Sequence, residues 1–127
     1  MAFVVNHKKI LWIGINIFMV AAMVIIGGIT RVTGSGLSMV EWRPLLGWFP
    51  PLSEQEWQRV FKLYQNSPEY RYINTWMDLN AFKGIFWWEY IHRLWGRLIG
   101  IVFFLPFIFF LITKKIKRKL LSRICFL

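Results

Sequence analysis

The hydrophobic and polar positions along the chain predict two membrane-crossing helices, and the first covers residues 10–29. This stretch reads ILWIGINIFMVAAMVIIGGI and carries no charged side chain. A helix of this length spans roughly 30 Å at about 1.5 Å per residue, which matches the thickness of a bilayer core. A secretory signal peptide would have a shorter apolar region and a small-residue cleavage site, whereas TRVT follows at residues 30–33. We therefore expect a retained transmembrane helix.

The second predicted helix is longer and crosses the membrane over residues 85–113. Residues 98–112 are entirely apolar (LIGIVFFLPFIFFLI), and a helical pattern continues upstream through FWWEYIHRLWGR. The helix is expected to start near Leu79, where Asp78 can serve as its N-cap. Pro106 lies inside the apolar stretch and should kink the helix or open a local gap in its backbone hydrogen bonding.

Residues 30–84 form a long loop between the two spans, with a predicted helix of its own. Residues 53–56 read SEQE, which is a capping box, and Leu52 and Trp57 occupy the positions of a hydrophobic staple. An apolar stripe with helical spacing then predicts an amphipathic helix over about residues 54–65 (Trp57, Val60, Phe61 and Tyr64). This helix can lie on the membrane surface or cover a site between the spans, and the pattern alone slightly favours the surface.

Composition and charge agree with a membrane protein and predict its orientation. The 127-residue chain is 57% hydrophobic, with a formal net charge of +10. Lysine and arginine gather in residues 1–9 and 114–127, whereas residues 30–78 of the loop hold as many acidic as basic residues. Both termini are therefore expected to be cytoplasmic and the loop to lie outside. Basic residues beside apolar spans fit the headgroups of a lipid bilayer, and we expect no nucleic-acid partner.

The strongest chemical signal is WWEYIHRLWGR, residues 87–97, at the outer end of the second span. Glu89 and His92 are three residues apart and share one face of a helix, and Gly96 follows one turn after His92. Arg93 and Arg97 lie one turn apart on an adjacent face. Charged groups near a membrane span are costly and usually face protein or water.

Spacing alone leaves three interpretations of this cluster open. Its tryptophans and arginines can form a structural belt at the membrane boundary. Glu89 and His92 can act as an ion pair or a proton relay. His92 can also be an axial heme ligand, with Gly96 making room for the porphyrin and the arginines pairing with propionates. Zinc is not expected, because the second histidine of the H-E-x-x-H pattern is missing.

Four segments of the chain resemble the N-terminal part of the heme A synthase family, in the form found in mitochondria and proteobacteria. They are GGITRVTGSGLS (27–38), PPLSEQEW (50–57), PEY (68–70) and FWWEYIHRLWGR (86–97), in the family's order. The resemblance implies oxidation of the C8 methyl of heme O to the formyl of heme A, with heme b as cofactor. It also implies an all-α integral membrane fold, in which the two spans and their partly helical loop are a quarter of an eight-helix bundle.

The resemblance further implies roles for single residues. His92 matches an axial ligand of the heme iron, and Glu89 matches the essential glutamate beside it. That carboxylate could move protons or stabilise a cationic intermediate during methyl oxidation. We assign Arg93 and Arg97 to the heme propionates, and Gly96 to the space beside the porphyrin. The loop helix then becomes a lid over the outer heme site, and which loop tryptophan faces heme stays open (Trp42, Trp48 or Trp57).

The family pattern also predicts an incomplete chain, because the family needs eight helices and this chain has two, and because the resemblance ends after about Lys117. The partner of His92 should come from the fourth helix of the bundle, and His7 precedes the first span on the opposite side. We therefore expect a gene fragment or truncated reading frame, with no activity alone. Heme O synthase, the missing helices or another copy of the chain are the expected protein partners. A small non-catalytic heme-binding or assembly protein is the alternative, and the short N-terminus without a transit peptide favours the bacterial plasma membrane.

Overall fold

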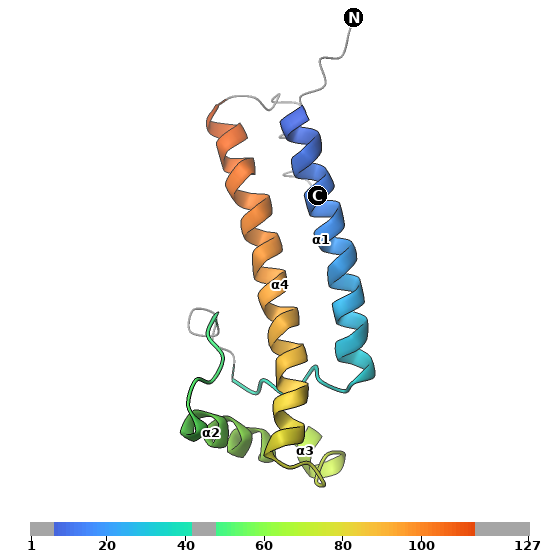
Figure 1. Ribbon diagram of the computed structural model, residues 1–127, viewed down its shortest axis with the longest axis vertical. Helices are drawn as coiled ribbons and strands as arrows, with labels where there is room; N and C mark the ends of the chain where they lie inside the picture. Colours follow the sequence, from blue (N-terminus) through green and yellow to red (C-terminus); the bar gives the residue numbers. More distant parts are fainter. Residues whose placement is uncertain (1–6, 42–47, 114–127) are drawn as a thin grey trace, which may run out of the picture. The chain divides into compact units, whose positions relative to one another are not determined.

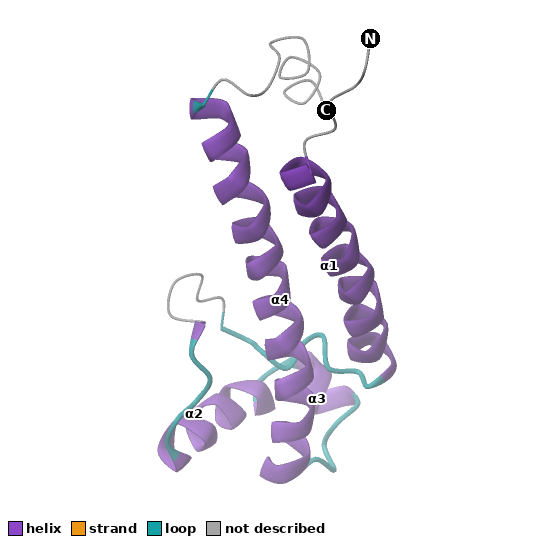
Figure 2. Cartoon of the chain, turned by 45° about the horizontal axis from the view of Figure 1, so that its top comes forward, coloured by secondary structure: helices purple, strands orange, loops and turns teal. Residues whose placement is uncertain are grey.

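The chain folds into helices joined by loops. We describe residues 7–41 and 48–113 of a computed structural model, so the predictions for both chain ends and for Trp42 lie outside the described residues. No strand occurs within the described part, and the elements are all helical (Figure 2). In chain order they are α1 (His7–Val32), α2 (Glu54–Gln65), α3 (Pro68–Tyr72) and α4 (Leu79–Ile112) (Figure 1).

Both α1 and α4 are long and apolar enough to cross a membrane. The expected all-α class with two such helices is therefore confirmed. Large apolar side chains project outward along both helices (Ile17, Phe18, Val24 and Ile25 on α1; Phe104, Leu105 and Phe109 on α4). An apolar surface of this extent would be unusual in water and is suited to contact with lipid or with further helices.

The chain divides into two compact units, and each contains part of both long helices. The first unit comprises Met1–Val20 with Arg97–Leu127, and the second comprises Ala21–Gly96. The second unit therefore holds the end of α1, the connecting loop, α2, α3 and the first half of α4.

In the first unit, Trp12 compensates for the hydrogen bond that Pro106 cannot make. The helix α4 continues through Pro106. Proline has no N–H, so the carbonyl of Val102, four residues earlier, lacks its usual helical partner. The indole Nε1 of Trp12 donates to that carbonyl at 2.9 Å, and its ring stacks on Phe103 with a centroid distance of 5.4 Å. The predicted backbone gap is thus present, and a side chain of α1 fills it.

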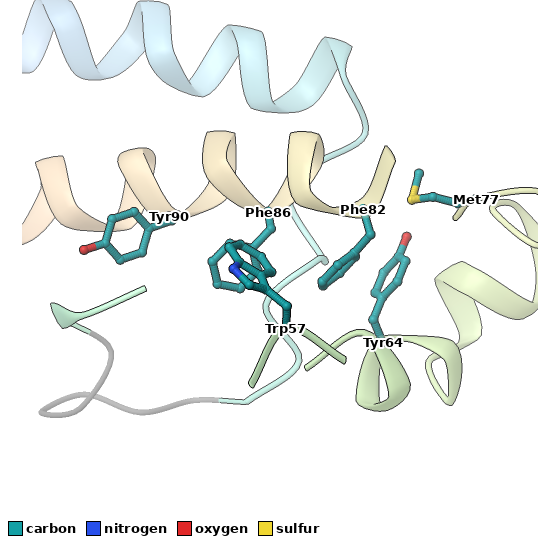
Figure 3. Packing of buried hydrophobic residues seen from close by; sticks show 6 residues of the cluster. All are labelled: Trp57, Tyr64, Met77, Phe82, Phe86 and Tyr90. Atoms are coloured by element: carbon teal, nitrogen blue, oxygen red, sulfur yellow. The ribbon is translucent and has the colours of Figure 1, made fainter. Parts of the chain in front are cut away.

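In the second unit, the apolar stripe of α2 packs against the first turns of α4. The ring of Trp57 lies 5.0 Å from that of Phe86, and the ring of Tyr64 lies 5.0 Å from that of Phe82. Figure 3 shows these side chains pointing toward one another between the two helices, with Tyr90 further along α4. Because this stripe is buried against protein, the same face of α2 cannot lie on a membrane surface.

Two predicted N-caps are present in this unit. The hydroxyl of Ser53 accepts a hydrogen bond from the amide of Glu56 at 3.2 Å, and α2 begins at the next residue, Glu54. The carboxylate of Asp78 accepts a hydrogen bond from the amide of Ala81 at 2.8 Å, and α4 begins at the next residue, Leu79. Both contacts satisfy amide groups that have no partner in the first turn of a helix.

The predicted hydrophobic staple is not formed. Leu52 is 84% exposed, whereas Trp57 is almost fully buried. The indole of Trp57 is directed toward Phe86, so it is not available to the side chain that precedes the cap. Tertiary packing onto α4 therefore takes the place of the local contact that the sequence predicted.

Candidate functional site

Glu89 is a buried carboxylate whose two oxygens are both bound by protein donors. Its residue is only 3% exposed. The hydroxyl of Ser38 and the backbone amide of Met39 each donate to Oε2 at 2.7 Å. The guanidinium of Arg93, one turn later on α4, donates to Oε1 and forms an ion pair with it. Hydrogen bonds to a charged acceptor are the strong ones, so this carboxylate is held firmly.

The turn that follows α1 brings Ser38 and Met39 to Glu89. Gly34 has a φ of +62°, a left-handed conformation that favours glycine. The amide of Ser35 then donates to the carbonyl of Thr30 at 2.9 Å, and the amide of Ser38 donates to the carbonyl of Ser35 at 3.2 Å. Ser35 and Ser38 are both fully buried. The polar run at the start of the loop is therefore a folded turn packed against α4.

Arg93 binds the turn as well as the carboxylate. Besides its ion pair with Glu89, its guanidinium donates to the carbonyl of Met39 at 3.3 Å. The guanidinium of Arg93 is therefore directed toward the turn. Its pairing with heme propionates stays a prediction. Arg97 follows one turn later and belongs to the first unit, and its predicted role beside heme propionates stays a prediction.

His92 is half-buried, and its ring lies against α1. A β-carbon built on Gly27 would come within 3.3 Å of the Nε2 atom of His92. Within the described part of the chain, neither ring nitrogen of His92 has a hydrogen-bond partner. Glu89 pairs with Arg93 and not with His92. The ion-pair interpretation of Glu89 and His92 is therefore wrong in this structure.

The space in which a side chain of Gly96 would lie is next to a residue of α1. A β-carbon on Gly96 would lie 3.4 Å from the terminal methyl of Met23 on α1. The missing side chain of Gly96 therefore allows close packing of Met23 from α1. Its use beside a porphyrin stays a prediction.

The chemistry of His92 suits a heme ligand better than a protein-only metal centre. Across residues 7–41 and 48–113, no group of three or more His, Cys, Asp or Glu side chains could hold a metal ion. A heme iron needs from the protein only an axial group such as imidazole. Among the described residues, His92 offers a ring without a hydrogen-bond partner, beside a glycine whose β-carbon would crowd that ring.

The loop is also attached to α4 at the residue after Glu89. The hydroxyl of Tyr90 donates to the carbonyl of Trp48 at 2.6 Å. Two consecutive residues of α4 therefore hold the segments on both sides of residues 42–47: Glu89 binds Met39, and Tyr90 binds Trp48. Trp57, in contrast, faces Phe86 in the core under α2.

A cavity of about 230 Å³ lies between these loop segments and α2. Its wall includes Met39, Pro51, Val60 and Phe86, and its polar groups include Arg59. The guanidinium of Arg59 donates to Glu41 at 3.0 Å and to Glu56 at 3.2 Å, and these hydrogen bonds raise its pKa above the ordinary arginine value. This network connects the loop before the cavity to α2.

Sequence reasoning missed three residues of this site: Gly27, Ser38 and Met39. Gly27 and Ser38 lie in the segment GGITRVTGSGLS, and Met39 follows it directly. A run of small and hydroxyl-bearing residues directly after an apolar span was the available signal. This signal does not identify the group that the turn binds, because Met39 binds Glu89 through its backbone amide and not through its side chain.

Comparison with known proteins places these residues in a family context. The family model for cytochrome oxidase assembly protein matches residues 10–127, so the predicted end of the resemblance near Lys117 is wrong. Heme A synthase of Nitrosomonas eutropha is 50% identical over 116 residues, which cover 91% of this chain and 33% of that protein. Heme A synthase of Paramagnetospirillum magneticum is 53% identical over 119 residues, 93% of this chain and 34% of that protein.

A third relative agrees with these two. Heme A synthase of Caulobacter sp. is 51% identical over 113 residues, which cover 89% of this chain and 33% of that protein. The chain thus spans about one third of the length of the curated relatives it matches. No solved structure matches it.

Proposed function

This chain belongs to the cytochrome oxidase assembly protein family, and from that premise we propose that it provides the first part of a heme A synthase. The proposed reaction is the oxidation of the C8 methyl of heme O to the formyl group of heme A. Relatives that are about half identical over most of this chain and bear the name heme A synthase support this assignment. Because the chain spans a third of those relatives, the reaction is proposed for the whole protein.

One arrangement supports the proposal most strongly: a fixed, buried carboxylate stands three residues before an imidazole whose ring nitrogens have no hydrogen-bond partner within residues 7–41 and 48–113. Both oxygens of Glu89 already accept hydrogen bonds, from Ser38, Met39 and Arg93. A carboxylate in this state is better suited to stabilising positive charge nearby than to carrying protons, because proton transfer would require it to give up a donor. We assign Glu89 this electrostatic role toward the methyl group under oxidation.

We assign His92 to heme, whose iron its imidazole would hold. When bound, heme b would supply the redox chemistry, and heme O would be the substrate. The chain's own contribution is to hold the His92 imidazole against α1 at Gly27, with ring nitrogens that accept or donate no hydrogen bond within the described part of the chain. Any further ligand would come from the remainder of the bundle.

We place the protein in the bacterial plasma membrane, with α1 and α4 as transmembrane helices and both termini cytoplasmic. The apolar length of both helices supports membrane insertion. The lysine and arginine residues at the two ends of the chain support the orientation. Glu89, His92 and the packed loop then lie at the outer side, where α2 covers the start of α4.

A chimera tests the proposed function. The first third of a relative, such as the Paramagnetospirillum magneticum protein, is replaced by this chain and produced in cells that make heme O but lack heme A synthase. We expect extracted membranes to contain heme A by chromatography, and the 127-residue chain alone to make none. His92→Ala and Glu89→Ala should abolish heme A formation, whereas Glu54→Gln, at an exposed carboxylate of α2, should not.

The chimera can also contradict the proposal. Heme A formation that persists in both His92→Ala and Glu89→Ala would contradict the roles assigned to these residues. A membrane-inserted chimera that makes no heme A would contradict the proposed function. A heme spectrum of the isolated chain, lost on His92→Ala and unaccompanied by heme A formation in the chimera, would instead favour the small heme-binding protein.

A further inference from the structure

The contact between Ser38 and Glu89 joins two fully enclosed side chains that are distant in sequence. Ser38 is completely buried, and Glu89 is 3% exposed. The Ser38 hydroxyl lies 2.7 Å from Oε2 of Glu89, 2.9 Å from the carbonyl of Ser35 and 3.4 Å from the carbonyl of Ile85. A hydroxyl has one proton to donate, and the charged acceptor at the shortest distance forms the strongest bond. Ser38 therefore donates to Glu89.

The backbone of the same turn supplies the second donor to the same oxygen. The amide of Met39 lies 2.7 Å from Oε2, while Arg93 binds Oε1 and also the carbonyl of Met39. The carboxylate is thus held from two directions, by the turn on one oxygen and by α4 on the other. Removing the Ser38 hydroxyl would leave Oε2 with one donor fewer in a place closed to water.

We propose that Ser38 is a positioning residue for Glu89, which fixes the direction of the carboxylate during methyl oxidation. The inference rests on the proposed function for its catalytic meaning, since Ser38 acts through Glu89. The hydrogen bond itself can be tested without any activity. Failure of the inference and failure of the function are therefore distinguishable.

Ser35 offers a matched control. It is as fully buried as Ser38 and belongs to the same turn, and its hydroxyl pairs with that of Thr33 instead of Glu89. Ser35→Ala and Ser38→Ala each remove one buried hydroxyl of equal size. A merely structural role would make the two substitutions equivalent, whereas a positioning role affects Glu89 only through Ser38.

The first measurement is the infrared carboxylate spectrum of the 127-residue chain in lipid nanodiscs. The band of Glu89 is assigned from its loss in Glu89→Gln. We expect Ser38→Ala to shift this band and Ser35→Ala to leave it in place. Equal shifts in both variants, or none in Ser38→Ala, would overturn the inference.

A second measurement uses the unmodified chain, so that it does not depend on whether a variant folds. The amide of Met39 should exchange slowly with deuterium, because it is bonded to a buried carboxylate. Exchange as fast as that of an unprotected loop amide would overturn the arrangement on which the inference rests.

The third measurement connects the hydrogen bond to the reaction. In the chimera, Ser38→Ala should lower the rate of heme A formation about tenfold and change its pH profile, because a hydrogen bond to a charged group is lost. Ser35→Ala should preserve the pH profile. A pH profile that is the same in Ser38→Ala and in the unsubstituted chimera would overturn the positioning role.

Discussion

Gly27 of α1 and His92 of α4 approach so closely that a β-carbon on Gly27 would lie 3.3 Å from Nε2 of His92. The neighbouring Gly28 differs, since a β-carbon there would meet nothing within 4 Å. Two adjacent glycines in the same apolar helix therefore have different surroundings. The first makes room for the imidazole that we assign to heme iron, and the second does not.

Gly27→Ala is expected to displace the His92 ring, because its methyl would be tighter against Nε2 than ordinary contacts allow. Gly28→Ala is the control and should add helix propensity of up to about 1 kcal/mol without touching His92. The measurement is the ¹⁵N chemical shift of the His92 imidazole in nanodiscs, with heme absorbance of the chimera as a second readout. Identical His92 shifts in the two variants would contradict the close approach.

Trp12→Phe is expected to destabilise the packing of α1 on α4 in the first unit. The substitution removes the indole N–H that binds the Val102 carbonyl, and interhelical hydrogen bonds in membranes contribute on the order of 1 kcal/mol. Pro106→Ala restores an amide that can bind the same carbonyl within α4. In a double-mutant cycle, Trp12→Phe should therefore cost less in the Pro106→Ala background, as followed by unfolding in a denaturing detergent. Equal costs in both backgrounds would show that Trp12 acts by packing alone.

Phe82→Ala is expected to lower the free energy of unfolding of the outer part of the second unit by about 3–5 kcal/mol. Phe82 is fully buried, and its ring contacts those of Phe61 and Tyr64. Leu52→Ala is the matched control and should change stability by less than about 0.5 kcal/mol, because Leu52 is 84% exposed. Limited proteolysis of the loop at increasing denaturant concentration compares the stabilities of the Phe82→Ala and Leu52→Ala variants. A large loss of stability in Leu52→Ala would show that the hydrophobic staple contributes to the fold, in contradiction to the structure.

Tyr64 is expected to make the packing of α2 sensitive to alkaline pH. Burial raises the pKa of the Tyr64 phenol above its ordinary value of about 10. Since the folded pKa is the higher one, its contribution to stability is complete below the ordinary pKa and is lost as pH rises through the folded pKa. Absorbance near the tyrosinate band should show Tyr64 titrating above the ordinary phenol pKa, and Tyr64→Phe should remove this late phase. A titration curve that is unchanged in Tyr64→Phe at high pH would contradict the burial of Tyr64.

Local patterns in the sequence were sufficient to predict both long helices, the caps at Ser53 and Asp78 and the apolar stripe of α2. Each depends on residues within a few positions of one another, or on the length of an apolar run against the thickness of a bilayer. The staple at Leu52 failed although it is equally local. Its partner Trp57 has a large apolar ring, and burial against Phe86 removes more of that ring from water than Leu52 could.

The partners of the charged cluster could not be predicted in this way. The spacing put Glu89 and His92 on one face, but their partners come from residues distant in sequence: Ser38 and Met39 for the carboxylate, and Gly27 for the imidazole. The run of small and hydroxyl-bearing residues after the first span does not identify such contacts, because a backbone amide or a missing β-carbon has no side-chain chemistry to recognise. Only the packing of the turn after α1 against α4 decided that the carboxylate of Glu89 is bound by three donors. The same packing leaves the ring nitrogens of His92 without a hydrogen-bond partner in the part of the chain that the structure describes.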